Sequence, residues 1–196
     1  MKHLSEKITD YIVKAGAISE KSYTVYQYGF QIGLEMLSCF LVCFFIAIYL
    51  HMIPEFIVLT CIFMLLRTYA GGVHLNSFGR CFICSVLVQT LILKISGQYV
   101  FPIIGSWIFI ILELMLIFLL APVEDVNKEL DEGEKKHCKK ITGKIVIGII
   151  IFSIFCTFNG FHKIISLIEL TVLVVLISQY IGILKYKIEK GIYRRK

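Results

Sequence analysis

Charged residues are scarce in this sequence, and their scarcity excludes an ordinary water-soluble domain. Only 17% of the 196 residues are charged, whereas 58% are hydrophobic, and the mean hydropathy is +0.82. A soluble domain of this length carries more charge and less apolar surface. The lipid bilayer is therefore the expected solvent for most of the chain.

The first thirty residues lack the compact apolar core of a cleavable signal peptide, so we expect none to be removed. Their apolar residues recur at helical spacing instead, at Leu4, Ile8, Ile12 and Ala15. A helix of this kind lies on the membrane surface, although a soluble cap packed on a bundle is an alternative. We predict an amphipathic interfacial helix over residues 1–30 and a polytopic membrane peptidase domain over 31–196.

Six long apolar runs occupy most of the remaining chain. They cover residues 34–53, 54–73, 82–97, 101–121, 143–160 and 163–184. Because a helix needs about 20 apolar residues to cross a bilayer, the predicted fold class is an all-α integral membrane protein with about six transmembrane helices. The second and third runs are short and end beside the polar segment 67–80, which leaves tilted, broken or re-entrant helices open there.

Lysine and arginine are almost missing from one side of this topology. Six spans put both termini, the 67–80 loop and the 122–144 loop on one side with 18 of the 20 basic residues, leaving Lys94 and Lys163 for the other. The positive-inside rule predicts that the basic side is cytoplasmic. The net charge of +6 suggests anionic lipid or an acidic partner. We expect no nucleic acid, because neither a reading element nor a zinc spacing is present.

Five of the seven cysteines give no sign of chemistry. Four lie inside apolar runs, where a free cysteine acts as a small hydrophobe: Cys39, Cys43, Cys61 and Cys156. Cys138 stands beside His137, and two ligands make a poor metal site because zinc normally takes four. We therefore predict no metal and no cofactor.

Cys81 and Cys84 differ because they open the third apolar run after a glycine-rich loop. Their C-x-x-C spacing is that of a redox motif, but the intervening residues are apolar and no thioredoxin-like pattern surrounds them. If the helix begins at Cys81, the helix dipole favours a thiolate there. Cys84 would then lie one turn deeper.

Residues 67–81 place a costly set of polar side chains in an apolar protein. The segment reads Arg-Thr-Tyr-Ala-Gly-Gly-Val-His-Leu-Asn-Ser-Phe-Gly-Arg-Cys. Polar residues near lipid are functional candidates by default. The set predicts a catalytic dyad in which His74 is the base and Cys81 the nucleophile, with Arg67 helping to hold the thiolate.

The spacing of the dyad requires a break in the helix. On one straight helix His74 and Cys81 would be separated by a rise of about 10.5 Å, whereas a thiol and its base must come within roughly 3 Å. Turn-forming residues supply the break at Gly71-Gly72, Asn76, Ser77 and Gly79. The alternatives are a chance pair, a histidine that contacts lipid headgroups, and glycines that serve only close helix packing.

The pattern Arg67-x-x-x-Gly71-Gly72-x-His74, followed by Cys81, resembles the signature of the accessory gene regulator B (AgrB) family. The stretch Ala121-Pro122-Val123-Glu124 resembles a second family segment, and Asn127-Lys128 follows it. This chain departs from that segment at Glu129, where the family pattern has proline.

The resemblance implies a membrane cysteine endopeptidase of Gram-positive bacteria that acts in quorum sensing. It implies His74 and Cys81 as the catalytic pair and Arg67, Gly71 and Gly72 as supporting residues. The implied substrate is an AgrD-like peptide pheromone precursor with an amphipathic leader and an acidic C-terminal tail. The enzyme would remove the tail, promote closure of a thiolactone or lactone ring, and act as a homodimer in the cell membrane.

The basic loop offers a place for the acidic tail, at Lys135, Lys136, Lys139 and Lys140. The positive-inside rule alone also accounts for these lysines. The acidic residues between 129 and 134 reduce the positive charge of this patch.

Two other activities compete with the peptidase. Glu113, Glu169 and Lys94 are polar residues inside apolar runs, and such residues can mark a transporter or channel. Cys81 and Cys84 could instead serve a membrane thiol oxidoreductase. A purely structural scaffold role would not explain the Arg-Gly-Gly-His-Cys cluster.

Overall fold

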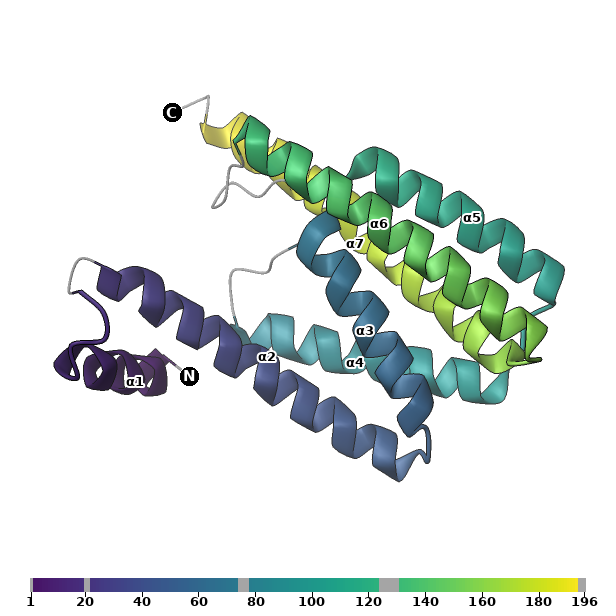
Figure 1. Cartoon of the computed structure of the whole chain (residues 1–196), viewed down its shortest axis with the longest axis horizontal. Coiled ribbons are helices and arrows are strands. Elements are labelled where there is room, and N and C mark those ends of the chain that lie inside the picture. Colours follow the sequence, from purple (N-terminus) through teal and green to yellow (C-terminus); the bar gives the residue numbers. More distant parts are fainter. Residues whose placement is uncertain (1, 20–21, 74–77, 124–130, 194–196) are drawn as a thin grey trace.

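The computed structural model describes residues 2–19, 22–73, 78–123 and 131–193, and every regular element in these ranges is an α-helix (Figure 1). The helices are α1 (Lys2–Lys14), α2 (Tyr23–Tyr49), α3 (Ile53–Ala70), α4 (Phe78–Gln98), α5 (Ile103–Leu120), α6 (Glu132–Phe158) and α7 (His162–Tyr193). The predicted fold class, six long helices after a short N-terminal one, is confirmed.

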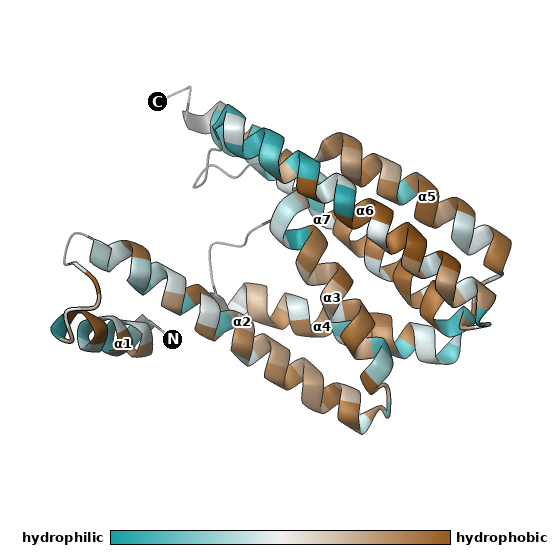
Figure 2. Cartoon of the chain, in the orientation of Figure 1, coloured by the Kyte–Doolittle hydropathy of each residue, from teal (hydrophilic) through white to brown (hydrophobic). Residues whose placement is uncertain are grey.

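All helices except α1 are long and apolar enough to cross a bilayer, so the chain is a multi-pass membrane protein with six candidate spans. Figure 2 shows the apolar residues along the length of these helices and hydrophilic residues at the start of α6. α3 has 18 residues, and the candidate span of α4, Cys81–Gln98, has 18 as well. These two spans are short, as predicted, and each is continuous over the described residues.

Two helices begin well before the predicted runs. α2 begins at Tyr23 rather than at residue 34, so the predicted boundary between residues 30 and 31 falls inside α2. α6 begins at Glu132 rather than at 143, so the stretch expected as a basic loop is helical from that residue onward. Hydropathy locates only the part of a helix that crosses lipid, and a polar extension gives no such signal.

A capping box explains the early start of α6. The backbone N–H of Glu134 donates to Asp131 Oδ1 at 2.6 Å, and the Asp131 N–H donates to Glu134 Oε2 at 3.2 Å. These bonds satisfy two donors that a helix N-terminus leaves free. Two acidic residues in the first turn also match the positive end of the helix dipole.

The core is built around α3 and α7. One buried cluster joins α3, α5, α6 and α7, with Leu66, Ile117 and Ile168 fully buried. A second cluster joins α2, α3, α4 and α7 through Phe56, Leu93 and Leu167. Half of the α7 span is buried, against 11% of the α2 span. α7 is therefore the central helix, and α2 faces the surroundings along most of its length.

α1 folds back along the first turns of α2 (Figure 1). Its buried positions are Ser5 and Thr9, and Tyr23 Oη of α2 donates to Asp10 Oδ1 at 2.8 Å. Leu4, on the predicted apolar face, remains 48% exposed. Apolar surface of α1 is thus left uncovered by α2, and contact of that surface with lipid stays a prediction.

The capping box of α6 can be tested by replacing Asp131. Asp131→Ala removes the side-chain acceptor and should weaken the first turn by about 1 kcal/mol, or about fivefold in local opening. Hydrogen exchange of the amides from Glu132 to Lys135, measured in lipid nanodiscs, should accelerate accordingly. Asp131→Asn retains an acceptor and serves as the control. Equal exchange in wild type and Asp131→Ala would contradict this account.

Candidate active site

The predicted dyad lies in the connection between α3 and α4. The chain leaves α3 at Ala70 and enters α4 at Phe78, so both helix ends lie at one end of the bundle. His74, Asn76 and Ser77 lie outside the described residues. The pairing of His74 with Cys81 therefore stays a prediction, and the described part of the site is what flanks it.

Residues 70–73, immediately before His74, are held by hydrogen bonds from three directions. Ala70 O accepts from the Val123 N–H and from Gln179 Nε2, each at 3.0 Å. The Val73 N–H donates to Ser178 O at 3.0 Å. Because α7 and the segment after α5 both contribute, elements far apart in the chain meet at this short stretch.

Arg67 completes the arrangement from the last turn of α3. Its Nη2 donates to the carbonyl of Val73, and its side chain is half-buried. Arginine suits this role because its planar guanidinium presents several N–H donors in fixed directions. The described contact of Arg67 is thus with the backbone that leads to His74. Its expected help to the Cys81 thiolate stays a prediction.

Gly71 and Gly72 are required by space and by backbone conformation. Gly71 has φ +80°, and a Cβ there would lie 2.5 Å from the Val123 carbonyl oxygen. Gly72 has φ +149°, and a Cβ there would overlap the Arg67 guanidinium and approach Ser178 Oγ to 2.8 Å. Such φ values strain any residue with a side chain. Both glycines predicted as supporting residues therefore lie inside this contact.

Sequence reasoning missed the α7 side of the contact, which consists of Ser178, Gln179 and Gly182. Gly182 is buried, and a Cβ there would lie 2.9 Å from the carbonyl carbon of Gly72. A glycine and a glutamine inside an apolar run are a weak signal of close packing and of a buried hydrogen bond. Neither signal identifies the part of the chain that packs against these residues.

Cys81 lies in the first turn of α4 and is half-buried. The helix begins at Phe78, three residues earlier than we expected, so Cys81 closes the first turn instead of opening it. The dipole of a helix acts within this first turn. Cys84 lies one turn deeper, as predicted, and is exposed.

The four predicted tail-docking lysines lie on the first turns of α6, not in a loop. Lys135 Nζ lies 3.5 Å from Glu132 Oε1, so an acidic neighbour already engages it. Lys139 Nζ lies over the Phe118 ring of α5, 5.6 Å from its centroid. Lys136 and Lys140 are exposed and one helical turn apart. These two therefore share the face that is open to a partner.

The residues of the transporter alternative are only partly brought together. Glu113 of α5 is 4% exposed, and α5 packs against α7, which carries Glu169. Within the described residues, one oxygen of each carboxyl is buried without a hydrogen-bond partner. Lys94 is exposed on α4 and forms no ion pair with any residue that the structure describes.

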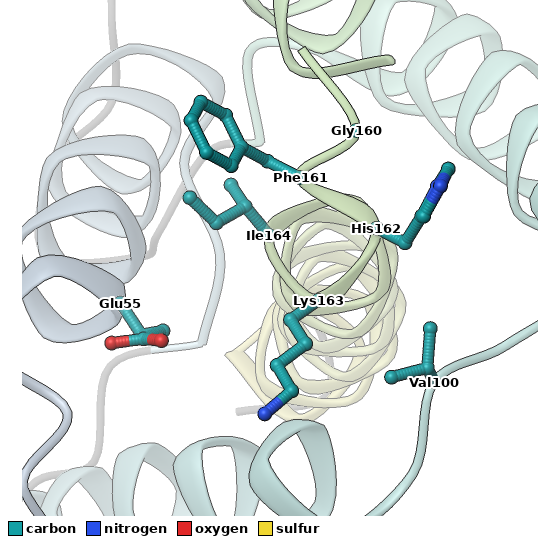
Figure 3. Close-up of a pocket in the computed structure, with 7 residues that line it drawn as sticks. All are labelled: Glu55, Val100, Gly160, Phe161, His162, Lys163 and Ile164. Atoms are coloured by element: carbon teal, nitrogen blue, oxygen red, sulfur yellow. The ribbon is translucent and has the colours of Figure 1, made fainter.

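A pocket of about 560 Å³ lies at the opposite end of the bundle, between the starts of α3 and α7. Figure 3 shows the residues that line it. Its polar lining comes from Glu55 at the start of α3 and from His162 and Lys163 at the start of α7. Arg67 follows Glu55 on α3 by 12 residues, a rise of about 18 Å. The pocket is therefore separate from the segment that holds the predicted dyad.

Comparison with known proteins gives matches along almost the whole chain. The family model described as Accessory gene regulator B matches residues 5–183. An AgrB-like protein of Clostridium beijerinckii is 29% identical over 126 residues, which span 62% of this chain and 62% of that protein. An AgrB-like protein of Listeria innocua is 27% identical over 198 aligned positions, which span 97% and 93%. No solved structure matches this chain.

The glycine pair can be tested through stability. Gly71→Ala and Gly72→Ala should each lower the melting temperature, because positive φ alone costs roughly 1–3 kcal/mol with a side chain and the new methyl groups also overlap their neighbours. Thermal unfolding of the protein in lipid nanodiscs measures the effect. Gly79→Ala is the matched control, because nothing lies within 4 Å of a Cβ there. If Gly71→Ala has the same melting temperature as Gly79→Ala, the proposed contact is wrong.

Proposed function

The chain belongs to the accessory gene regulator B (AgrB) family, and on that premise we propose that it is a membrane-embedded cysteine endopeptidase acting on an AgrD-like precursor. Membership implies a role in precursor processing for quorum sensing. The proposed reaction removes the acidic C-terminal tail and promotes closure of a thiolactone or lactone ring. In this proposal Cys81 is the nucleophile and His74 its base.

One observation carries the proposal: the backbone up to Val73 is tightly held, and a cysteine lies in the first turn of the helix that follows. His74 is the next residue after Val73, and Cys81 is half-buried near the start of α4. A reactive cysteine needs a positive environment and access to substrate. The helix dipole supplies the former, and incomplete burial permits the latter.

The chemistry follows from these two groups. His74 accepts the thiol proton, and the Cys81 sulfur attacks the carbonyl carbon of the scissile peptide bond. The bond to the tail nitrogen breaks, the tail amine takes the proton from His74, and the pheromone part remains on Cys81 as a thioester. A thiol of the substrate can then attack that thioester, which frees Cys81 and closes a thiolactone ring. Because one thioester replaces another, the last step needs little driving force.

A site at the edge of the membrane favours ring closure over hydrolysis. Water competes for the thioester, whereas the substrate thiol is tethered to it and has a high effective concentration. The short connection between α3 and α4 lies at the ends of membrane-spanning helices, where access of water is restricted. The amphipathic leader of the precursor could share this interface with α1. We place this end of the bundle and both termini in the cytoplasm, on the basis of charge.

The start of α6 is the proposed docking place for the acidic tail. Lys136 and Lys140 are the best placed of the four lysines, because Lys135 is already close to Glu132 and Lys139 packs on Phe118. Exposed ion pairs contribute little individually, so several lysines would be needed to hold a tail. The homodimer stays a prediction.

The catalytic roles can be tested by cleavage of a short precursor with an acidic tail, using purified protein in lipid. Cys81→Ala should abolish cleavage because the nucleophile is lost, and His74→Ala should lower kcat roughly 10²- to 10⁴-fold. Cys84→Ser should remain close to wild type. Mass spectrometry of the released tail measures each rate.

Three outcomes would reject this mechanism. Cleavage by Cys81→Ala would show that another group is the nucleophile. Loss of activity in Cys84→Ser equal to that in Cys81→Ser would favour the thiol oxidoreductase, because only a redox pair needs both sulfurs. Activity that depends on Glu113 and Glu169 but not on Cys81 would favour the transporter.

Tail docking can be tested by reversing charge on α6. The double variant Lys136→Glu/Lys140→Glu should raise KM about five- to tenfold, as expected for about 1 kcal/mol of lost attraction, and the effect should shrink as salt is added. kcat should remain near that of wild type. Lys163→Glu, at the opposite end of the bundle, is the control. An unchanged KM at low salt would refute docking at this surface.

A further inference from the structure

Two side-chain positions on α7 support the segment before His74, and neither belongs to the motif that marks the site. Gln179 Nε2 donates to Ala70 O at 3.0 Å, and Gly182 lies against Gly72 and Val73. Next to Gln179, the carbonyl of Ser178 accepts the Val73 N–H at 3.0 Å. The central helix α7 therefore contacts the backbone atoms of residues 70–73, not their side chains.

Gly182 makes the bond from Val73 to α7 possible. Residues i and i+4 of a helix share a face, and the Cβ of a helical residue points back toward the helix N-terminus. A side chain at 182 would therefore extend over the carbonyl of Ser178. A Cβ there would lie 2.9 Å from Gly72 C and 3.0 Å from Val73 N, both backbone atoms. By contrast, nothing lies within 4 Å of a Cβ at Gly148 in α6.

The amide of Gln179 is not explained by stability alone. The side chain is fully buried, and its Oε1 has no hydrogen-bond partner in the described part of the chain. A buried amide oxygen without a partner destabilises a fold. Ala70 O would also remain satisfied without Gln179, because it accepts from the Val123 N–H. An apolar side chain of the same length would therefore pack here at no loss of stability.

We propose that Gln179 and Gly182 are positioning residues that fix the backbone of residues 70–73, immediately before His74. The inference rests on the proposed function, since it gives His74 the role of base. Gln179 directs the Ala70 carbonyl, and Gly182 lets Val73 lie on the surface of α7. Together they fix the position of the backbone that leads to residue 74.

The test compares Gln179→Met and Gly182→Ala with Gly148→Ala, a matched glycine change on a surface with no neighbours. Cleavage of the acidic-tailed precursor in nanodiscs gives kcat and KM, and thermal unfolding monitors the fold. Gln179→Met should lower kcat roughly 10- to 100-fold, because small misplacements of a catalytic group are costly, and should melt no earlier than wild type. KM should stay within about twofold, because neither residue binds substrate.

A second measurement separates positioning from a general structural role. The rate of Cys81 alkylation by iodoacetamide, followed on the Cys81 peptide by mass spectrometry, reports how well His74 assists the thiol. Gln179→Met and Gly182→Ala should slow alkylation in the wild-type background and have no further effect in His74→Ala. Such non-additivity is expected only of residues that act through His74.

The outcomes distinguish this inference from the proposed function. If Gln179→Met keeps the kcat of Gly148→Ala, or if the variants slow alkylation equally with and without His74, the positioning role is wrong. If His74→Ala cleaves the precursor as fast as wild type does, the proposed catalytic dyad itself is wrong, and the positioning role falls with it. If Gly182→Ala lowers the melting temperature, its kcat does not test the positioning role. The kcat of Gln179→Met then decides the question, because that variant is predicted to be at least as stable as wild type.

Discussion

The structure depends on one constraint, which is that backbone polar groups near lipid must find partners within the protein. A helix satisfies its own backbone, but the connection between α3 and α4 cannot. Here three backbone groups at the start of this connection find partners. Ala70 O accepts from Val123 after α5 and from Gln179 of α7, and the two groups of Val73 pair with Ser178 of α7 and Arg67 of α3. The break in the membrane helices is thus possible only where those elements converge.

This constraint also explains the central place of α7. To reach Ala70 and Val73, α7 must pack along α3, and it does so while contributing to both hydrophobic clusters. Gly71, Gly72 and Gly182 bring the backbones close enough for the hydrogen bonds to form. A rigid support of this kind is what a catalytic base requires, because a side chain on a loosely held connection would lose its orientation.

The sequence predicts the spans and the location of the site, but not its support. Apolar runs identify six helices because the bilayer demands them, whereas the polar starts of α2 at Tyr23 and α6 at Glu132 depend on local contacts and on a capping box. Arg67 and Cys81 were singled out because polar residues are costly near lipid, and Gly71 and Gly72 because glycines break a helix and match the family pattern. Gln179 and Gly182 were missed because they lie more than 100 residues away, and their role arises only from how α7 packs on α3. Val123 was noticed through a family resemblance, and only the fold places it against Gly71.

The most direct test of the account is to trap the acyl-enzyme. Precursor is mixed with protein in lipid, quenched in acid within the first turnover, digested and analysed for thioester adducts on each of the seven cysteines. The account predicts an adduct of the pheromone segment on Cys81 in wild type and in Cys84→Ser, and none in Cys81→Ala. Efficient release of the tail with no adduct on Cys81, or with an adduct on a different cysteine, would contradict it.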